Sequence, residues 1–347
     1  MGKLKRTVFW IVGVGLSLFV GLTAVETAAR LLSLAAPLQG AYANYVTDAY
    51  LPYKPKPSSR MTGRTDEFEY DYHHNRFGFR DVEHVIAKGE GTFRILGLGD
   101  SFTYGAGVAF EETYLYRLEA MVNMRPGIHP RVEVIKAGIP RYFPEPERVL
   151  LEKYGVQFRP NLVLVGFLPN DVIDTYQGLD AVTVDRSGYL MTREAKALGQ
   201  LGMQIYRYSH FGRVLLRRYV DWRIQRNYWP PEDELFRTGG FHERDWAKIE
   251  SEYDKMLAMT DSIGARLVVF HIPQKGPWTG KSRYPATRLS AWAAKRDVDF
   301  TDLLPAMERA SARERLYYEK DGHCTAAGHA VIAQELYRYL TDHNLIP

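Results

Sequence analysis

The sequence predicts an α/β domain in which helices cover both faces of a parallel β-sheet. Five short apolar segments have the length and composition of buried strands, at residues 94–99, 132–138, 162–167, 266–273 and 298–303. Candidate helices alternate with them, at about residues 111–125, 144–158, 243–263, 285–296 and 325–342. Strands that alternate with helices form parallel sheets buried on both faces. Because ligands in such sheets bind beyond the carboxyl ends of the strands, catalytic residues are expected there.

Length and composition favour one globular domain. The chain has 347 residues, of which 46% are hydrophobic and 25% charged, as in ordinary globular proteins. A net charge of +4, with no basic stripe interleaved with aromatics, does not indicate nucleic-acid binding. The single cysteine, Cys324, excludes an intramolecular disulfide framework and a cysteine-based zinc site.

The N-terminal segment predicts a membrane anchor. Residues 7–25 carry no charge over 19 positions, which suits a hydrocarbon core of roughly 30 Å. Lys3, Lys5 and Arg6 precede the segment, so we expect a single-pass helix with a cytoplasmic N-terminus and the following domain outside the cytoplasm. A cleaved signal peptide is the alternative, since small residues follow the apolar segment, namely Ala28, Ala29, Ala35 and Ala36.

The rest of the chain divides into a tether and one domain. We predict the anchor at residues 1–30, a tether at 31–66 and one globular domain at 67–347 with an insertion at about 175–240. The tether is inferred from Pro37, Pro52, Pro55 and Pro57. Residues 67–80 alternate aromatic and polar side chains, as in a half-buried strand or hairpin. The arginine-rich insertion is either a solvated helix or a cap or surface that meets anionic groups.

Ser101 follows the first strand in the segment RILGLGDSFTYGAGV. There its hydroxyl can face solvent and its amide can face a bound oxyanion. A helix N-cap is the alternative role of this serine. Phe102 stands where a dinucleotide fingerprint needs its third glycine, and Thr103 stands where a GxSxG elbow needs glycine, so both motifs are excluded.

Asp321 and His323 lie in a predicted loop before the last helix, in YYEKDGHCTAAGH. A serine hydroxyl needs a base, and the imidazole needs an acceptor that fixes its tautomer. One residue separates Asp321 from His323, so the carboxylate can reach Nδ1 and leave Nε2 for Ser101. The alternatives are a turn-capping aspartate with a surface histidine, and His329 as the competing base.

These segments resemble the conserved blocks of the SGNH/GDSL hydrolases. The GDS of residues 99–101 resembles the first block, KAGIPRYFPEPE the second, LVLVGFLPNDVID the third and DGHCTAAGH the last, in the family's order. NRFGFRDVEH also resembles the lead-in of anchored bacterial members. The resemblance implies a flavodoxin-like three-layer α/β/α fold with five parallel strands in the order 2-1-3-4-5. It also implies an oxyanion hole formed by the Asn170 side chain and the backbone amides of Ser101 and of Arg141 or Gly138.

Three blocks depart from the family pattern. Arg141 stands where the second block usually has glycine, and Gly138 lies three residues earlier. Leu168 replaces the glycine of the third block, although Asn170 remains. Cys324 and Thr325 stand where proline and asparagine are common, and we interpret Cys324 as a small packing residue rather than a second nucleophile.

The resemblance implies a serine esterase that hydrolyses acetyl or other acyl esters of an envelope glycan or lipid through an acyl-enzyme. An O-acyltransferase that acylates a cell-envelope polysaccharide would use the same residues. A catalytically silent envelope scaffold is the third hypothesis. No metal or organic cofactor is expected, because the sequence offers no ligand cluster.

Overall fold

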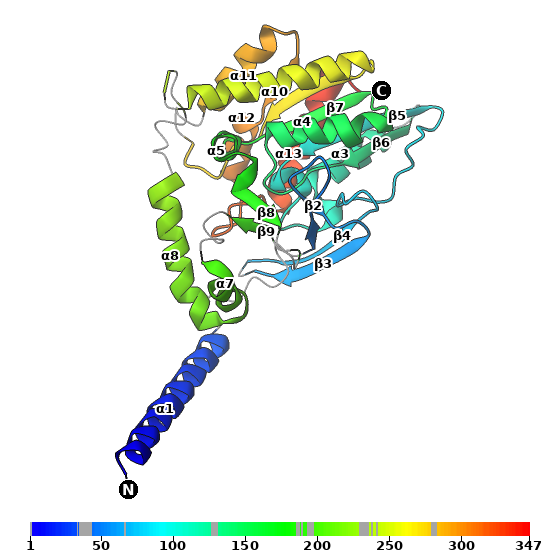
Figure 1. Cartoon of the computed structure of the whole chain (residues 1–347). Helices are drawn as coiled ribbons and strands as arrows, with labels where there is room; N and C mark the ends of the chain where they lie inside the picture. Colours follow the sequence, from blue (N-terminus) through cyan, green and yellow to red (C-terminus); the bar gives the residue numbers. More distant parts are fainter. Residues whose placement is uncertain are drawn as a thin grey trace. The chain divides into compact units, whose positions relative to one another are not determined.

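The computed structural model describes residues 2–32, 34, 44–65, 67–125, 131–184, 188, 190–192, 198–228, 236, 239–240, 242–278 and 283–347 (Figure 1). The chain divides into two compact units. Unit 1 combines Met1–Gln39 with Met191–Trp229, and unit 2 combines Gly40–Leu190 with Pro230–Pro347.

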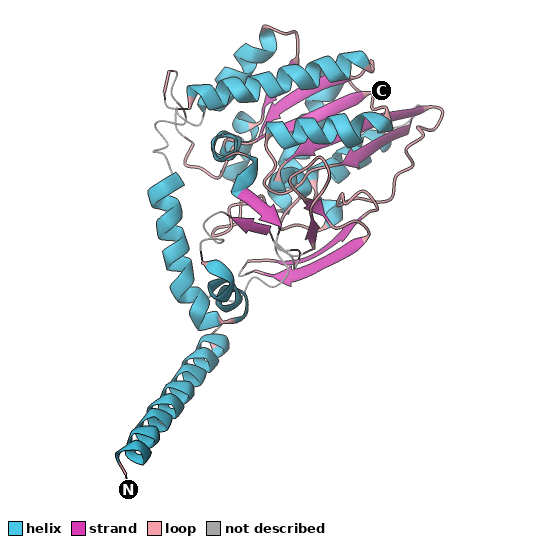
Figure 2. Ribbon diagram, viewed as in Figure 1, coloured by secondary structure: helices cyan, strands magenta, loops and turns pink. Residues whose placement is uncertain are grey.

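A five-stranded parallel sheet forms the centre of unit 2 (Figure 2). Its strands are β5 (Thr92–Gly99), β6 (Arg131–Lys136), β7 (Leu162–Phe167), β10 (Arg266–His271) and β11 (Asp299–Asp302). Their spatial order is β11-β10-β7-β5-β6, which confirms the predicted order 2-1-3-4-5. Every residue of the central strand β7 is buried, which explains its continuous apolar sequence.

Helices cover both faces of this sheet, which confirms the predicted three layers. One face packs against α4 (Pro144–Leu150), α5 (Asn170–Gln177), α10 (Glu243–Ser262) and α11 (Tyr284–Ala294). The other packs against α3 (Tyr114–Asn123), α12 (Leu304–Ser311) and α13 (Ala326–Asp342). The short helix α2 (Ser101–Tyr104) follows β5 directly.

Short helical turns complete unit 2. A π-helical turn (Leu151–Gly155) and a 3-10 turn (Val156–Phe158) continue α4, so the single helix predicted at 144–158 changes its hydrogen-bonding pattern on the way. Further 3-10 turns are η1 (Phe110–Glu112) and η4 (Leu179–Ala181).

The predicted tether is wrong from residue 44 onward. This stretch forms the short strands β1 (Tyr45–Val46) and β2 (Lys54–Pro55) and the longer β3 (Ser59–Arg64). Tyr45 and Tyr53 are only 2% exposed and belong to the main core of unit 2. Prolines suit extended edge strands as well as tethers, and the buried tyrosines decide between the two.

A β-hairpin precedes the first strand of the large sheet. β3 pairs antiparallel with β4 (Glu69–His74), whose residues alternate between exposed and buried. The strand predicted for residues 67–80 is confirmed over residues 69–74, and its hairpin partner β3 lies before the predicted stretch.

The predicted insertion contributes to both units. The strands β8 (Val182–Val184) and β9 (Leu190–Thr192) form a two-stranded sheet, and the helices α7 (Gly199–Tyr208) and α8 (His210–Tyr228) follow. Residues 191–229 belong to unit 1, so the predicted domain boundary at 67–347 does not hold for this part of the insertion.

The N-terminal helix α1 (Lys3–Leu31) forms unit 1 together with α7 and α8. Its segment Lys5–Leu31 is long and apolar enough to cross a membrane, and a signal sequence would meet the same criterion. Near the end of α1, the Glu26 carboxylate accepts hydrogen bonds from Ser209 Oγ at 2.7 Å and from the His210 and Phe211 amides at 3.0 Å. Glu26 therefore caps the N-terminus of α8.

Candidate active site

Ser101 is the first residue of α2, directly beyond the carboxyl end of β5. The Asp100 carboxylate caps this helix by accepting a hydrogen bond from the Phe102 amide at 2.8 Å. The Ser101 amide belongs to the first turn, where amides have no partner within the helix. Asp100 therefore fulfils the N-cap role that the sequence left open for Ser101.

The loop between Tyr317 and Cys324 carries the predicted base. An antiparallel bridge between these two residues closes the loop, and Gly322 has a φ of +85° that lets the chain turn back. Asp321 Oδ1 thereby reaches Nδ1 of His323. It also accepts a hydrogen bond from the His323 amide at 3.3 Å.

The structure brings the predicted serine, histidine and aspartate together. His323 Nε2 lies 2.8 Å from Ser101 Oγ, while Asp321 occupies the other ring nitrogen. Burial alone would raise the pKa of Asp321, but its hydrogen bond and charge interaction with His323 hold that pKa below its usual range. An ionised Asp321 can fix the imidazole tautomer and stabilise an imidazolium.

The competing base His329 lies in α13 with its ring fully buried. Its Nδ1 accepts a hydrogen bond from the Tyr114 amide at 3.3 Å, and its ring stacks on that of Tyr114. Burial lowers the pKa of His329 to about 3, so the ring stays neutral. The interactions of His329 are those of a core residue.

Cys324 also lies in the core, beside the predicted base. Its side chain is fully buried, and a Cβ added at Gly328 would lie 3.1 Å from Cys324 Sγ. Burial raises the pKa of the thiol, which disfavours the thiolate. These contacts agree with the packing role expected for Cys324.

Asn170, the first residue of α5, lies beside the nucleophile. Its Nδ2 lies 3.5 Å from Asp100 Oδ2, and Ser101 Oγ lies 3.5 Å from the same oxygen, so the amide and the hydroxyl are close neighbours. Asn170 Nδ2 also donates to Asp174 Oδ2 at 3.1 Å, while its Oδ1 accepts from Gln274 at 3.4 Å. Hydrogen bonds therefore orient both the nitrogen and the oxygen of the Asn170 side-chain amide.

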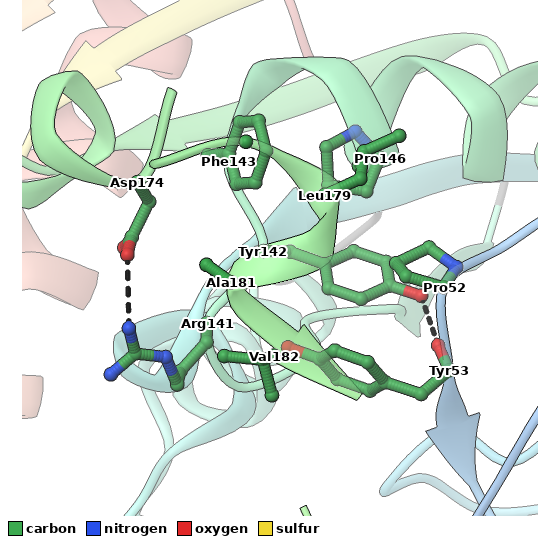
Figure 3. Close-up of a pocket in the computed structure, with 11 residues that line it drawn as sticks. Pro52, Tyr53, Arg141, Tyr142, Phe143, Pro146, Asp174, Leu179, Ala181 and Val182 are labelled. Atoms are coloured by element: carbon green, nitrogen blue, oxygen red, sulfur yellow. Dashed lines mark hydrogen bonds and ion pairs between the residues drawn. The ribbon is translucent and has the colours of Figure 1, made fainter. Parts of the chain in front are cut away.

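Gly138 and Arg141 border the same region. A Cβ at Gly138 would lie 2.4 Å from the Tyr104 amide nitrogen, so only glycine allows this close approach to α2. Arg141 has a φ of +62°, the left-handed conformation that favours glycine, and glycine is the residue expected at this position from the family resemblance. Its guanidinium pairs with Asp174 at 3.2 Å (Figure 3).

A small pocket adjoins this ion pair (Figure 3). Arg141 and Asp174 point toward each other on one side of the pocket. On another side the Tyr142 hydroxyl donates to the Tyr53 carbonyl, which links the pocket to the N-terminal part of unit 2. Of the predicted site residues, Arg141 lines this pocket, and Ser101, Asn170 and His323 do not.

A cluster of buried carboxyl groups, which interact with Asp100 beside the nucleophile, was not anticipated from the sequence. Burial raises the pKa of Asp100 to about 6, and it raises the pKa values of Glu147 and Asp171 well above their usual range. Asp174 was also missed, although its place four residues after Asn170 on one helix face was a usable signal. Within the part of the chain that the structure describes, no cluster of His, Cys, Asp and Glu is arranged to hold a metal ion.

The sequence and fold of this chain are similar to those of known proteins. A model of the GDSL-like lipase/acylhydrolase family matches residues 98–331, from β5 into α13. Similar solved structures include TesA, 13% identical with a TM-score of 0.44 over 72% of this chain and 98% of that chain. A catalytic mutant of the acetylxylan esterase Axe2 from Geobacillus stearothermophilus is 11% identical with a TM-score of 0.45, over 74% of this chain and 96% of the other. No curated protein matches the sequence.

Proposed function

The chain belongs to the GDSL-like lipase/acylhydrolase family and is an ester-bond hydrolase. We propose that Ser101, His323 and Asp321 carry out the reaction. The observation that supports these roles best is the 2.8 Å contact between Ser101 Oγ and His323 Nε2, with Asp321 bound to the opposite ring nitrogen. This is the arrangement in which a weak hydroxyl nucleophile is activated.

The proposed reaction proceeds through an acyl-enzyme. His323 Nε2 takes the proton of Ser101 as Oγ attacks the ester carbonyl, and Asp321 stabilises the imidazolium that forms. The Asn170 side chain and the amides of Ser101 and of Gly138 or Arg141 receive the charge on the carbonyl oxygen. The imidazolium returns its proton to the leaving alcohol, and water then hydrolyses the acyl group with His323 again as base.

A fluorophosphonate probe and a nitrophenyl acetate assay test this proposal. The wild-type chain is expected to be labelled at Ser101 and to turn over the ester, while Ser101→Ala does neither. Absence of both labelling and turnover in the folded wild-type protein would contradict the esterase proposal. That result would favour a catalytically silent scaffold.

We further propose that the substrate is an acyl ester of an envelope glycan or lipid outside the cytoplasm. The apolar segment of α1, preceded by Lys5 and Arg6, supports an anchor with a cytoplasmic N-terminus. In spheroplasts expressing the full chain, protease added outside should digest unit 2. Protection of unit 2 until the membrane is dissolved would contradict this orientation.

Acyl transfer to a sugar is tested on the same acyl-enzyme. Nitrophenyl acetate turnover is measured with and without an added oligosaccharide, and sugar products are analysed by mass spectrometry. A hydrolase releases acetate at the same rate in both cases. Acetylated oligosaccharide with reduced acetate release would instead assign an O-acyltransferase.

A further inference from the structure

We propose that Glu67, in the turn of the β3–β4 hairpin, is a positioning residue that holds the loop of Asp321 and His323 in its active geometry. Glu67 Oε1 accepts a hydrogen bond from the Glu319 amide at 2.7 Å. Its Oε2 accepts from the Lys320 amide at 2.8 Å and from the Asp321 amide at 2.7 Å. The proposal rests on the esterase function proposed above, and its test includes a measurement that does not depend on activity.

The contact is strong because the Glu67 carboxylate accepts hydrogen bonds from three consecutive backbone amides. Hydrogen bonds to an ionised acceptor are about twice as strong as neutral ones. Partial loss of water would raise the pKa of Glu67, but the three amides outweigh it and lower that pKa. Glu67 is therefore ionised at neutral pH and binds the backbone of the residues that lead directly into His323.

The loop needs such a contact because its own burial is small. Residues 319–321, which lead into His323, are exposed, so packing alone restrains them weakly. The Lys275 ammonium group donates a hydrogen bond to the Glu319 carbonyl. Glu67 and Lys275 thus hold the backbone of the same residue by its amide and its carbonyl.

The turn of the β3–β4 hairpin also fixes the position of Glu67. Thr65 Oγ1 accepts hydrogen bonds from the amides of Glu67 at 3.2 Å and Phe68 at 3.1 Å. The next side chain, Phe68, packs on Tyr318, with 4.9 Å between the ring centres. Glu67 is therefore placed against the loop by a defined turn and an adjacent aromatic contact.

The same N-terminal segment also supports the helix of the nucleophile. The buried Arg80 guanidinium donates to the carbonyls of Tyr104 at 3.2 Å and Val108 at 2.7 Å, at and beyond the end of α2. The Tyr72 hydroxyl accepts from the Gly107 amide at 2.7 Å. Arg80 and Tyr72, like Glu67, precede the residues 98–331 that match the family model. The segment before β5 therefore contacts both the loop of Asp321 and His323 and the helix that begins at Ser101.

Three variants of the full chain test the proposal. Glu67→Ala removes all three acceptor contacts, and Glu67→Gln keeps the shape but replaces one acceptor oxygen with a donor. Glu69→Gln is the matched control, because Glu69 lies two residues away on β4, is mostly exposed, and pairs only loosely with Arg64 at 3.7 Å. Glu67→Gln and Glu69→Gln each remove one negative charge from the same hairpin.

The catalytic readout is kcat per active site, counted by complete fluorophosphonate labelling. Misplacing a catalytic group by about 1 Å can cost about 100-fold. We expect Glu67→Ala to lower kcat about 10- to 100-fold and Glu67→Gln less, with KM within about twofold because Glu67 contacts the loop rather than the ester. Formate should restore part of the kcat of Glu67→Ala. Glu69→Gln should match the wild type.

Hydrogen exchange supplies the readout that is independent of activity. The amides of residues 319–321 should be protected in the wild type and in Glu69→Gln, and should lose protection in Glu67→Ala. Unchanged exchange in Glu67→Ala, or a lower melting temperature with kcat within about twofold of the wild type, would overturn the proposal. A wild-type protein with protected amides but no labelling and no turnover would contradict the esterase proposal alone.

Discussion

The two sides of the candidate active site are built differently. On the acid–base side, His323 lies between Ser101 and an ionised Asp321, and each contact joins a donor to an acceptor. On the oxyanion side, the proposed donor Asn170 lies beside two carboxyl groups, Asp100 and Asp174. Burial raises the pKa values of both acids, to about 6 for Asp100, while the charge of Arg141 opposes this shift at Asp174. One side thus pairs a histidine with a single carboxylate, whereas the other places an amide donor beside two buried carboxyl groups.

The largest expected effect comes from breaking the acid–base side at its nucleophile. Ser101→Ala should lower nitrophenyl acetate turnover by about 10⁴-fold or more, because no other group in the site replaces the hydroxyl. The melting temperature should stay near that of the wild type, since Asp100 rather than Ser101 caps α2. A large loss of stability with residual turnover would assign Ser101 a structural role.

The next effect comes from the oxyanion side. Asn170→Ala should lower kcat about 10²- to 10³-fold with little change in KM, as expected for the loss of one oxyanion donor. Asp174→Asn keeps the donor but weakens the contact that orients it, so we expect a loss of about tenfold. Steady-state kinetics of the two variants compares the loss of the donor Asn170 with a weaker contact from Asp174, which orients that donor. Equal and small effects would remove Asn170 from the oxyanion hole.

The sequence predicted the sheet and the contact between Asp321 and His323 because both depend on short patterns. The continuous apolar strands forced a buried parallel sheet, and the one-residue spacing of Asp321 and His323 allowed their contact. The pairing of Glu67 with residues 319–321 joins segments more than 250 positions apart, and no local pattern indicates it. Residues 44–65 were misread as a tether because proline suits both extended states, and only packing distinguishes them.

A smaller effect comes from the titration of His329, the buried histidine of α13. The pKa of His329 in the fold is about 3, below the roughly 6.5 of an unfolded histidine. The unfolded chain therefore binds the proton first, and His329 lowers the free energy of unfolding as pH falls from about 6.5 to about 3, by up to about 1.4 kcal/mol per pH unit. In His329→Asn this slope should diminish, while turnover persists.

Urea unfolding at several pH values between 4 and 7 measures that slope, with wild type and His329→Asn compared at equal ionic strength. Asparagine can replace the Nδ1 acceptor for the Tyr114 amide, so the variant is expected to fold. An unchanged pH slope would show that other groups govern acid unfolding. Complete loss of turnover in the folded variant would reopen the choice of base between His323 and His329.

The smallest expected effect concerns Cys324, which adjoins His323 but faces the core. Because burial raises the pKa of its thiol, Cys324 should not react as a nucleophile in the folded protein. Cys324→Ala should keep kcat within about twofold and lower stability by about 1 kcal/mol through lost packing. Iodoacetamide should leave the native enzyme active and modify Cys324 only after unfolding. Rapid inactivation of the native wild type, absent in Cys324→Ala, would show that the thiol is accessible near the base, and the acid–base side would then contain a second reactive group.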